Sequence, residues 1–202
     1  MKKARATFLL VGLDNSGKTT LARAVKYGYE AGKNGKGRAP VRGFGRGDGD
    51  SEGEGEAKRH LDVEPTIGFK VEKVEVSKRL KLNIVDMSGQ QCYRELWETY
   101  YEDVQGILFV VDAADPKRFE EAKAALESVV GHRELLSKPL LLFSNKMDLA
   151  GAPTSAEVAK EVGLGDLAHH LSRAWRLQGC SAITGEGVDD GLKWMISQVK
   201  AS

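Results

Sequence analysis

Short apolar runs alternate along the chain with longer segments in which apolar residues recur every three or four positions. The runs at 8–11, 106–111 and 140–143 are apolar throughout, as expected for strands buried on both faces of a parallel sheet. Thr154 followed by Glu157 is typical of a capping box at a helix start. Together with three segments of helical spacing, at 120–130, 155–163 and 187–199, these runs predict an α/β protein built from βαβ units.

Residues 67–86 depart from this pattern, because apolar and polar positions alternate on both sides of a charged turn at 77–79. The pattern predicts an antiparallel hairpin joined to an otherwise parallel sheet. The parity of the apolar positions changes between Val71 and Val74, which predicts a β-bulge in the first strand of the hairpin.

A glycine-rich segment, residues 27–60, precedes this hairpin. It is basic in its first half, acidic in its second half and almost free of large aliphatic residues. Such a segment buries too little apolar surface to offset the entropy of ordering it, so we expect a disordered insertion at about 30–60. A solvated linker and a charged docking loop both remain open as its role.

The length of 202 residues suits one α/β domain with a two-sided core, and we expect a single domain over 1–202. Thirty basic residues nearly cancel 29 acidic ones, for a formal net charge of +1, so bulk charge gives no argument for nucleic acid or an anionic membrane. Cys92 and Cys180 lack the spacing of a metal site and are expected to be reduced thiols. Any specificity must therefore come from a localised site.

The segment GLDNSGKTT, residues 12–20, follows the first apolar run and contains the Walker A pattern GxxxxGK[ST]. Gly12 and Gly17 let the backbone curl so that successive N–H groups face phosphate oxygens, and the following helix adds its positive end. Lys18 is expected to neutralise the β- and γ-phosphates, and Thr19 to offer a hydroxyl to Mg²⁺. The loop predicts a nucleoside triphosphate site without specifying the base.

A second motif, FSNKMDL, follows a predicted strand and can recognise the base of the nucleotide. In this motif Asp148 can accept from guanine N1–H and the exocyclic amine, and the stem of Lys146 can cover the ring. Asn145 can either bond the base edge or brace the loop. The segment CSAITGEG, 180–187, follows a further predicted strand and is expected to present the Ala182 N–H to the guanine carbonyl.

The segments VDMSGQ and EPTIGF contain residue types suited to sensing a γ-phosphate. Asp86 ends a predicted strand, where a carboxylate can support the direct ligands of Mg²⁺. The Gly89 N–H is expected to meet the γ-phosphate when its segment moves in, and Gln90 to orient the attacking water. Thr66 is expected to close on Mg²⁺ from the other side and to be released after hydrolysis.

Taken together, GLDNSGKT, PTIGF, DMSGQ, LWETYYED, ILFVVDAAD, NKMDL and GLKWM resemble the ADP-ribosylation-factor and factor-like small GTPases. The resemblance covers nearly the whole chain except about 30–60. It implies the small-GTPase (Ras-like) fold of P-loop NTPases, with a six-stranded, mostly parallel sheet, one antiparallel hairpin and helices on both faces. It also implies a GTP/GDP switch that uses Mg²⁺, hydrolyses GTP slowly, and slides the 67–86 hairpin by register between nucleotide states.

The resemblance further implies roles for individual residues. Gln90 positions the water, and Mg²⁺ is held by Thr19 and Thr66 with Asp86 behind them. Asp14 places a carboxylate over the γ-phosphate, and no arginine of this chain is evident at the site, so an activating protein is expected to supply one and raise the rate on the order of 10³–10⁵. The implied nucleotide-binding residues are Asp14, Asn15, Ser16, Gly17, Lys18, Thr19, Thr20, Thr66, Gly89, Asn145, Lys146, Asp148, Ser181, Ala182 and Ile183.

Protein partners are implied in the same way. Phe69 with Trp97 and Tyr100 predicts an aromatic effector patch across the hairpin and the two switch segments, although aromatics at helical spacing are equally typical of a core. Val85 stands where many family members carry an aromatic residue. The expected partners are an exchange factor, a GTPase-activating protein and an effector, namely a coat or adaptor of membrane or ciliary trafficking such as the BBSome coat.

Family members usually open with an amphipathic helix that lies on the membrane in the GTP state. The first predicted strand starts within a few residues of Met1, so we expect direct membrane contact only if such a helix is missing from a truncated chain. The expectation is a cytoplasmic monomer that is recruited to a membrane or cilium with GTP and binds no nucleic acid.

Two other functions remain open. A P-loop kinase for a small molecule would need an arginine-rich lid and an acceptor pocket, and the NKMD turn argues against it. A non-hydrolysing, GTP-dependent binding module would switch in shape only, and Gln90 argues weakly against that alternative.

Overall fold

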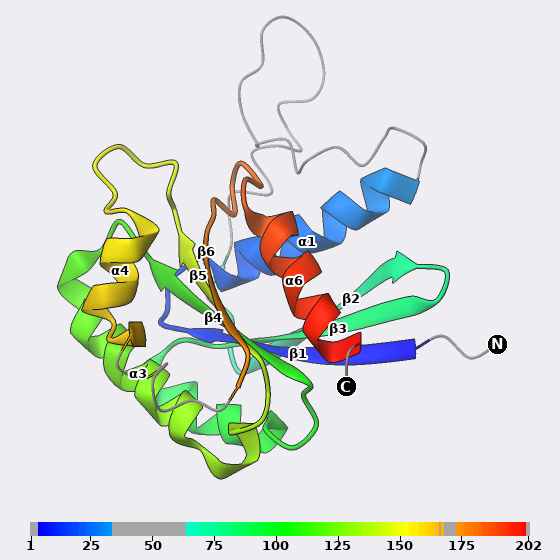
Figure 1. Ribbon diagram of the computed structural model, residues 1–202, viewed down its shortest axis with the longest axis horizontal. Helices are drawn as coiled ribbons and strands as arrows, with labels where there is room; N and C mark the ends of the chain where they lie inside the picture. The colour runs from blue at the N-terminus through cyan, green and yellow to red at the C-terminus, as the bar shows by residue number, and fades with distance from the viewer. Residues whose placement is uncertain (1–3, 34–63, 166, 168–172, 201–202) are drawn as a thin grey trace, which may run out of the picture.

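A single sheet organises the computed structural model, which describes residues 4–33, 64–165, 167 and 173–200. Its six strands lie in the order β2-β3-β1-β4-β5-β6 (Figure 1). Neighbouring strands are parallel except for β2, which pairs antiparallel with β3. This is the predicted α/β sheet with its one hairpin. The strands are β1 (Ala4–Gly12), β2 (Phe69–Ser77), β3 (Leu80–Met87), β4 (Gly106–Asp112), β5 (Leu140–Asn145) and β6 (Trp175–Gly179).

Helices cover both faces of this sheet, as predicted. Among the described helices, none combines the length and the apolar character needed to cross a membrane. Thr154 caps its helix as predicted, since its backbone N–H and the side chain of Glu157 are 2.7 Å apart and its hydroxyl accepts from the Glu157 N–H. The helical segments are α1 (Lys18–Lys33), η1 (Gln91–Tyr100), η2 (Pro116–Arg118), α3 (Phe119–Gly131), η3 (Arg133–Leu135), α4 (Ser155–Glu161) and α6 (Val188–Lys200).

Two separate cores lie on the two faces of the sheet, because successive residues of a strand point to opposite sides. In β1, Phe8 and Leu10 pack with residues of α1 and α6, whereas Leu9 and Val11 pack with residues of η1, α3 and α4. Figure 1 shows α1 and α6 on one side of the strands and α3 with η1 on the other. Burial on both sides explains why these strands are apolar at every position.

The first helix extends further than expected. Residues 27–33, assigned to the glycine-rich insertion, continue α1, and Tyr29 is buried in the core. Leu21, Val25 and Tyr29 are spaced four residues apart, so they lie on the same helix face and continue its packing. The rest of the predicted insertion, residues 34–60, lies outside the described residues.

The predicted bulge in the hairpin is also misplaced. The pairing of β2 with β3 is regular from Phe69 to Glu75 and shifts only between Glu75 and Ser77. β2 is an edge strand, and most of its residues are exposed. Val71 and Val74 therefore need not point to the same face, and no bulge is required between them.

Candidate functional site

A cavity of about 360 Å³ lies where the carboxyl ends of β1 and β3 meet the start of β2. Open α/β sheets bind ligands outside the carboxyl ends of their strands, so this edge is the expected place for a site. The cavity joins the Walker A loop to the segments 64–66 and 87–90. It is lined by Asp14, Asn15, Gly17, Lys18, Thr19, Thr20, Glu64, Pro65, Thr66, Met87, Ser88, Gly89 and Gln90.

The backbone of the Walker A loop is shaped to hold phosphate. Gly12 and Gly17 have φ angles of 139° and 92°, and Asn15 has a φ of 60°, which lets the chain curl within a few residues. A Cβ on Gly12 would lie 2.2 Å from the Val110 carbonyl oxygen, so no larger residue fits. Because α1 begins at Lys18, the N–H groups of its first turn lie beside the cavity.

Lys18 provides a buried positive charge in this loop. Its ammonium donates to the Leu13 carbonyl at 2.6 Å. Burial lowers the pKa of Lys18 to about 8, and the attraction of Asp86 opposes this effect. A phosphate beside the ammonium would favour its charged form, so the lysine suits an anionic ligand.

The three residues predicted to serve Mg²⁺ lie together. Thr19 Oγ1 is 2.9 Å from Thr66 Oγ1 and 2.6 Å from Asp86 Oδ2. Oxygen ligands at about 2.0–2.1 Å in octahedral positions are themselves about 2.9 Å apart, so the two hydroxyls fit one Mg²⁺. Asp86 is buried, which raises the pKa of its carboxyl, and its Oδ1 has no hydrogen-bond partner among the described residues. This donor set fits Mg²⁺, which Thr19 and Thr66 would ligate with Asp86 behind Thr19.

Gly89 and Gln90 lie against the Walker A loop. A Cβ built on Gly89 would be 2.2 Å from the Asp14 nitrogen, so the two backbones are in direct contact. Ser88 fixes this approach, because its N–H donates to the Gly68 carbonyl at 2.8 Å and its carbonyl accepts from the Trp97 indole at 2.8 Å. The structure therefore brings Gly89 and Gln90 together with Lys18 and Thr66 around one cavity.

Asn145, at the end of β5, braces the loops beside the Walker A segment. Its Nδ2 donates to the Ser16 carbonyl at 2.8 Å, and its Oδ1 accepts from the Ala182 N–H at 2.9 Å. Of the two roles left open for Asn145, this is the bracing role. The Ala182 N–H, predicted to meet the guanine carbonyl, donates to the buried Asn145 side chain in this structure, and its role towards the base stays a prediction.

The remaining base-recognition residues lie in the loops that Asn145 joins. The ammonium of Lys146 pairs with Asp112 Oδ2 at 2.6 Å, and Lys146 has a left-handed φ of 67°. Asp148 is exposed, as recognition of an external base requires, while Ser181 and Ile183 lie in the loop after β6. None of these residues lines the 360 Å³ cavity, but their loops are bonded directly to the Walker A segment through Asn145.

The predicted aromatic patch is only partly present. Trp97 is buried with 3% of its surface exposed, so the prediction that it belongs to an effector surface is wrong, and it packs in the core instead. Phe69 and Tyr100 do meet, with ring centroids 5.0 Å apart, and Phe69 remains 47% exposed.

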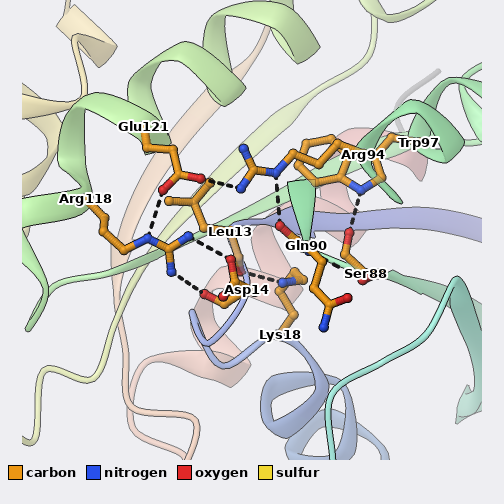
Figure 2. Close-up of polar contacts among 10 residues, drawn as sticks. Leu13, Asp14, Lys18, Ser88, Gln90, Arg94, Trp97, Arg118 and Glu121 are labelled. Atoms are coloured by element: carbon orange, nitrogen blue, oxygen red, sulfur yellow. Dashed lines mark hydrogen bonds and ion pairs between the residues drawn. The ribbon is translucent and has the colours of Figure 1, made fainter. Parts of the chain in front are cut away.

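Sequence reasoning missed a set of charged residues beside the loop. Arg118 Nη2 lies 2.7 Å from Asp14 Oδ1, although no arginine of the chain was expected at the site (Figure 2). Glu121 and Arg94 extend the same network. No motif marks these residues, because Arg118 and Asp14 are 104 positions apart in the sequence.

A phosphate-shaped loop, a hydroxyl pair fitted to Mg²⁺ and a braced NKMD loop, all at one edge of this sheet, define a P-loop nucleotide-binding protein. Comparison with known proteins narrows the class. Residues 55–199 match the ADP-ribosylation factor family. The ADP-ribosylation factor-like protein 3 of Caenorhabditis elegans is 34% identical over 192 residues, which cover 95% of this chain and 86% of that protein. The chain therefore belongs to the ADP-ribosylation factor family.

A solved structure agrees in fold over nearly the whole chain. The Arl6 BBS3 small GTPase of Trypanosoma brucei, solved with the bound nucleotide analogue GppNp, superposes with a TM-score of 0.75 at 27% identity. The match covers 98% of this chain and 99% of that one. Within the family, the motifs LDNSGKT, DMSGQ and NKMDL predict the greatest likeness to ADP-ribosylation factor-like protein 6, and this structure is a relative of that kind.

Family membership settles the general activity. The protein is a small GTPase whose cofactors are GTP or GDP and Mg²⁺. Of the functions left open by the residues alone, GTP hydrolysis is therefore retained, and the small-molecule kinase is set aside.

Proposed function

We propose that this GTPase is a switch that recruits an effector only when GTP fills the cavity. One observation carries the proposal: the segments 64–66 and 87–90 that wall the cavity lead directly into exposed apolar residues. Ile67, directly after the first segment, is 74% exposed; Phe69 and Val71 on β2 are also exposed, and so is Leu96 on η1, which follows the second segment. A ligand that orders the cavity wall therefore also orders this surface.

The residues predicted for nucleotide binding support this coupling through their positions. We assign the phosphates to Lys18 and to the backbone of 14–20, with Thr19 and Thr66 holding Mg²⁺ and Asp86 orienting Thr19. When bound there, Mg²⁺ would neutralise part of the phosphate charge. Since Thr66 lies in the segment that leads to Ile67, loss of the γ-phosphate would release one end of the exposed surface.

Guanine recognition is assigned to the braced loops. Asp148 accepts from the base, the stem of Lys146 covers it, and Asn145 holds both loops against Ser16. The Lys146 ammonium bonded to Asp112 keeps that stem in place without needing the ligand. Ser181 and Ile183 complete the wall of the base site.

Hydrolysis is assigned to Gln90, which orients the attacking water beside the Gly89 N–H. Arg118 is not available to stabilise the transition state, because its guanidinium already bonds Asp14 and Glu121. An arginine from an activating protein is therefore still required, with an effect on the order of 10³–10⁵ in rate.

The effector is proposed to be a coat or adaptor of membrane or ciliary trafficking, with the BBSome coat as the specific candidate. Similarity to the Arl6 BBS3 small GTPase supports this choice. An exchange factor and an activating protein complete the cycle, and the monomeric protein moves from the cytoplasm to a membrane or cilium with GTP.

Affinity capture with parallel loading tests this function. Wild-type protein bound to GDP or to a non-hydrolysable GTP analogue is incubated with a ciliated-cell extract, and the retained proteins are compared. We expect a coat or adaptor complex in the GTP-analogue sample alone.

Two variants sharpen the result. Phe69→Ser removes an apolar group from the exposed surface and should abolish capture, whereas Leu136→Ser removes an equally exposed leucine far from the cavity and should not. Identical retained sets with GDP and the analogue would contradict the switch.

A further inference from the structure

Arg118 holds both the side chain and the backbone of Asp14. Its Nη2 lies 2.7 Å from Asp14 Oδ1, and its Nη1 lies 3.1 Å from the Asp14 carbonyl oxygen. Its Nε donates to Glu121 Oε2 at 2.9 Å (Figure 2). One guanidinium thus connects the Walker A loop to the first turn of α3 through three separate hydrogen bonds.

Glu121 continues this connection to the segment after β3. Its other carboxylate oxygen accepts from Arg94 Nη2 at 2.5 Å, and Arg94 Nε donates to the Gly89 carbonyl at 3.0 Å. That carbonyl belongs to the planar peptide between Gly89 and Gln90, so its direction fixes where the Gln90 backbone starts. We call the series Asp14, Arg118, Glu121, Arg94 and the Gly89 carbonyl the arginine chain.

The arginine chain closes a loop, because its two ends also touch. The Gly89 backbone packs on the Walker A loop so tightly that a Cβ would lie 2.2 Å from the Asp14 nitrogen and 2.3 Å from the Leu13 carbonyl carbon. Two routes therefore join Asp14 to Gly89, one by backbone contact and one by charged side chains. A shift of either segment must disturb both routes.

The charge of Asp14 makes this arrangement relevant to the nucleotide. Asp14 lines the same cavity as Lys18 and Thr66, and its side chain is 47% exposed. A carboxylate there repels an anionic ligand, and it repels the triphosphate more than the diphosphate. The hydrogen bond from Arg118 keeps the pKa of Asp14 below its ordinary value, so the carboxylate is neutralised by pairing and not by protonation.

We propose that Arg118 is a positioning residue of this GTPase, which neutralises Asp14 beside the γ-phosphate and ties the Walker A loop through Glu121 and Arg94 to the backbone of Gln90. The proposal rests on the assignment of the cavity to GTP. It assigns Arg118 two separable effects: preference for GTP through charge, and hydrolysis through the position of Gln90.

A double-mutant cycle tests the first effect. Affinities for GDP and for a non-hydrolysable GTP analogue are measured by competition with a fluorescent nucleotide, and their ratio is compared between variants. Arg118→Gln should weaken the analogue about tenfold relative to GDP. In the background of Asp14→Asn the same Arg118→Gln change should alter the ratio less than about twofold, because no charge is left to neutralise.

Arg118→Lys separates the second effect. A lysine ammonium can pair with Asp14 but lacks the planar fork that bonds Asp14 and Glu121 at once. Arg118→Lys should therefore keep the affinity ratio near that of the wild type and still slow single-turnover hydrolysis several-fold. Arg133→Gln, which removes an exposed arginine that pairs with Glu134, is the matched control and should change neither measurement.

The results distinguish a failure of the proposed Arg118 role from a failure of the proposed GTP site. Equal weakening of GDP and of the analogue in Arg118→Gln, or an undiminished effect in the Asp14→Asn background, overturns the role of Arg118 while the GTP site stands. A wild-type protein that binds neither nucleotide overturns the assignment of the cavity and the role of Arg118 with it.

Discussion

Glu121 lies between two guanidinium groups, those of Arg118 and Arg94. These contacts hold the pKa of Glu121 at about 2, compared with its ordinary value of 4.5. A carboxylate whose pKa is lower in the folded state stabilises the fold above its unfolded pKa. That contribution is lost as the pH falls from about 4.5 towards about 2.

Replacing Glu121 by Gln should therefore flatten the acid side of the stability profile. Between about pH 6 and about pH 4, wild type should lose about 0.5 kcal/mol more unfolding free energy than Glu121→Gln, a figure kept small because the side chain is 40% exposed. Urea unfolding at the two pH values measures the difference. Glu120→Gln changes the neighbouring exposed carboxylate and should follow the wild type; equal pH slopes in all three proteins would show that Glu121 does not contribute to the acid sensitivity.

At the scale of elements, Trp97 connects η1 by a hydrogen bond to the residue that follows β3. Its indole N–H donates to the Ser88 carbonyl at 2.8 Å, and Ser88 is buried. The Ser88 carbonyl and the Gly89 N–H belong to one trans peptide, so they point in opposite directions. The indole therefore directs the Gly89 N–H away from η1.

Trp97→Phe keeps an aromatic ring in the core but removes this donor. We expect a loss of about 1–3 kcal/mol in unfolding free energy, because the buried carbonyl is left without its partner. Affinity for a GTP analogue should fall more than affinity for GDP, since only the γ-phosphate needs the Gly89 N–H. Urea unfolding and nucleotide competition give the two numbers. Trp194→Phe on α6 makes the same chemical change elsewhere and should leave the ratio of affinities unaltered.

The elements were predictable from the sequence where burial leaves a periodic pattern. The central strands are apolar throughout because helices cover both faces of the sheet. The capping residues Thr154 and Glu157 predicted the start of α4 because their hydrogen bonds are local in sequence. The end of α1 was missed because glycines in 28–32 obscured the four-residue spacing that brings Tyr29 to the core. The bulge was misplaced because Val71 is an apolar residue on the exposed face of the edge strand, whereas Val74 lies on the buried face.

At the scale of the whole molecule, the predictable and unpredictable parts of the site differ in sequence distance. Lys18 and Thr19 lie in one contiguous motif, and so do Asn145 and Asp148, so their chemistry could be inferred without a structure. The pairing of Arg118 with Asp14 spans 104 positions, and that of Asn145 with Ser16 spans 129. Such contacts depend on the order of strands in the sheet, which no local pattern specifies.

The strongest coupling across the molecule is expected between the nucleotide and Thr66. Any ligand that binds only the folded protein stabilises it, by about 2.7 kcal/mol when present at a hundred times its dissociation constant. For a domain of this size that corresponds to a rise of roughly 5–10 °C in Tm. GDP and a GTP analogue, each with Mg²⁺, should both give such a rise in the wild type.

Thr66→Ala should separate the two nucleotides. The Thr66 hydroxyl lies 2.9 Å from Thr19 Oγ1 and is assigned to Mg²⁺ in the GTP state, so its removal should lower the Tm rise with the analogue and leave the rise with GDP. Chelating Mg²⁺ should then reduce the analogue effect less in Thr66→Ala than in wild type. Differential scanning fluorimetry measures all of these shifts, with Ser197→Ala, which removes an exposed hydroxyl on α6, as the control. If Thr66→Ala lowers the Tm rise for both nucleotides equally, Thr66 acts on the loop generally and does not distinguish the GTP state.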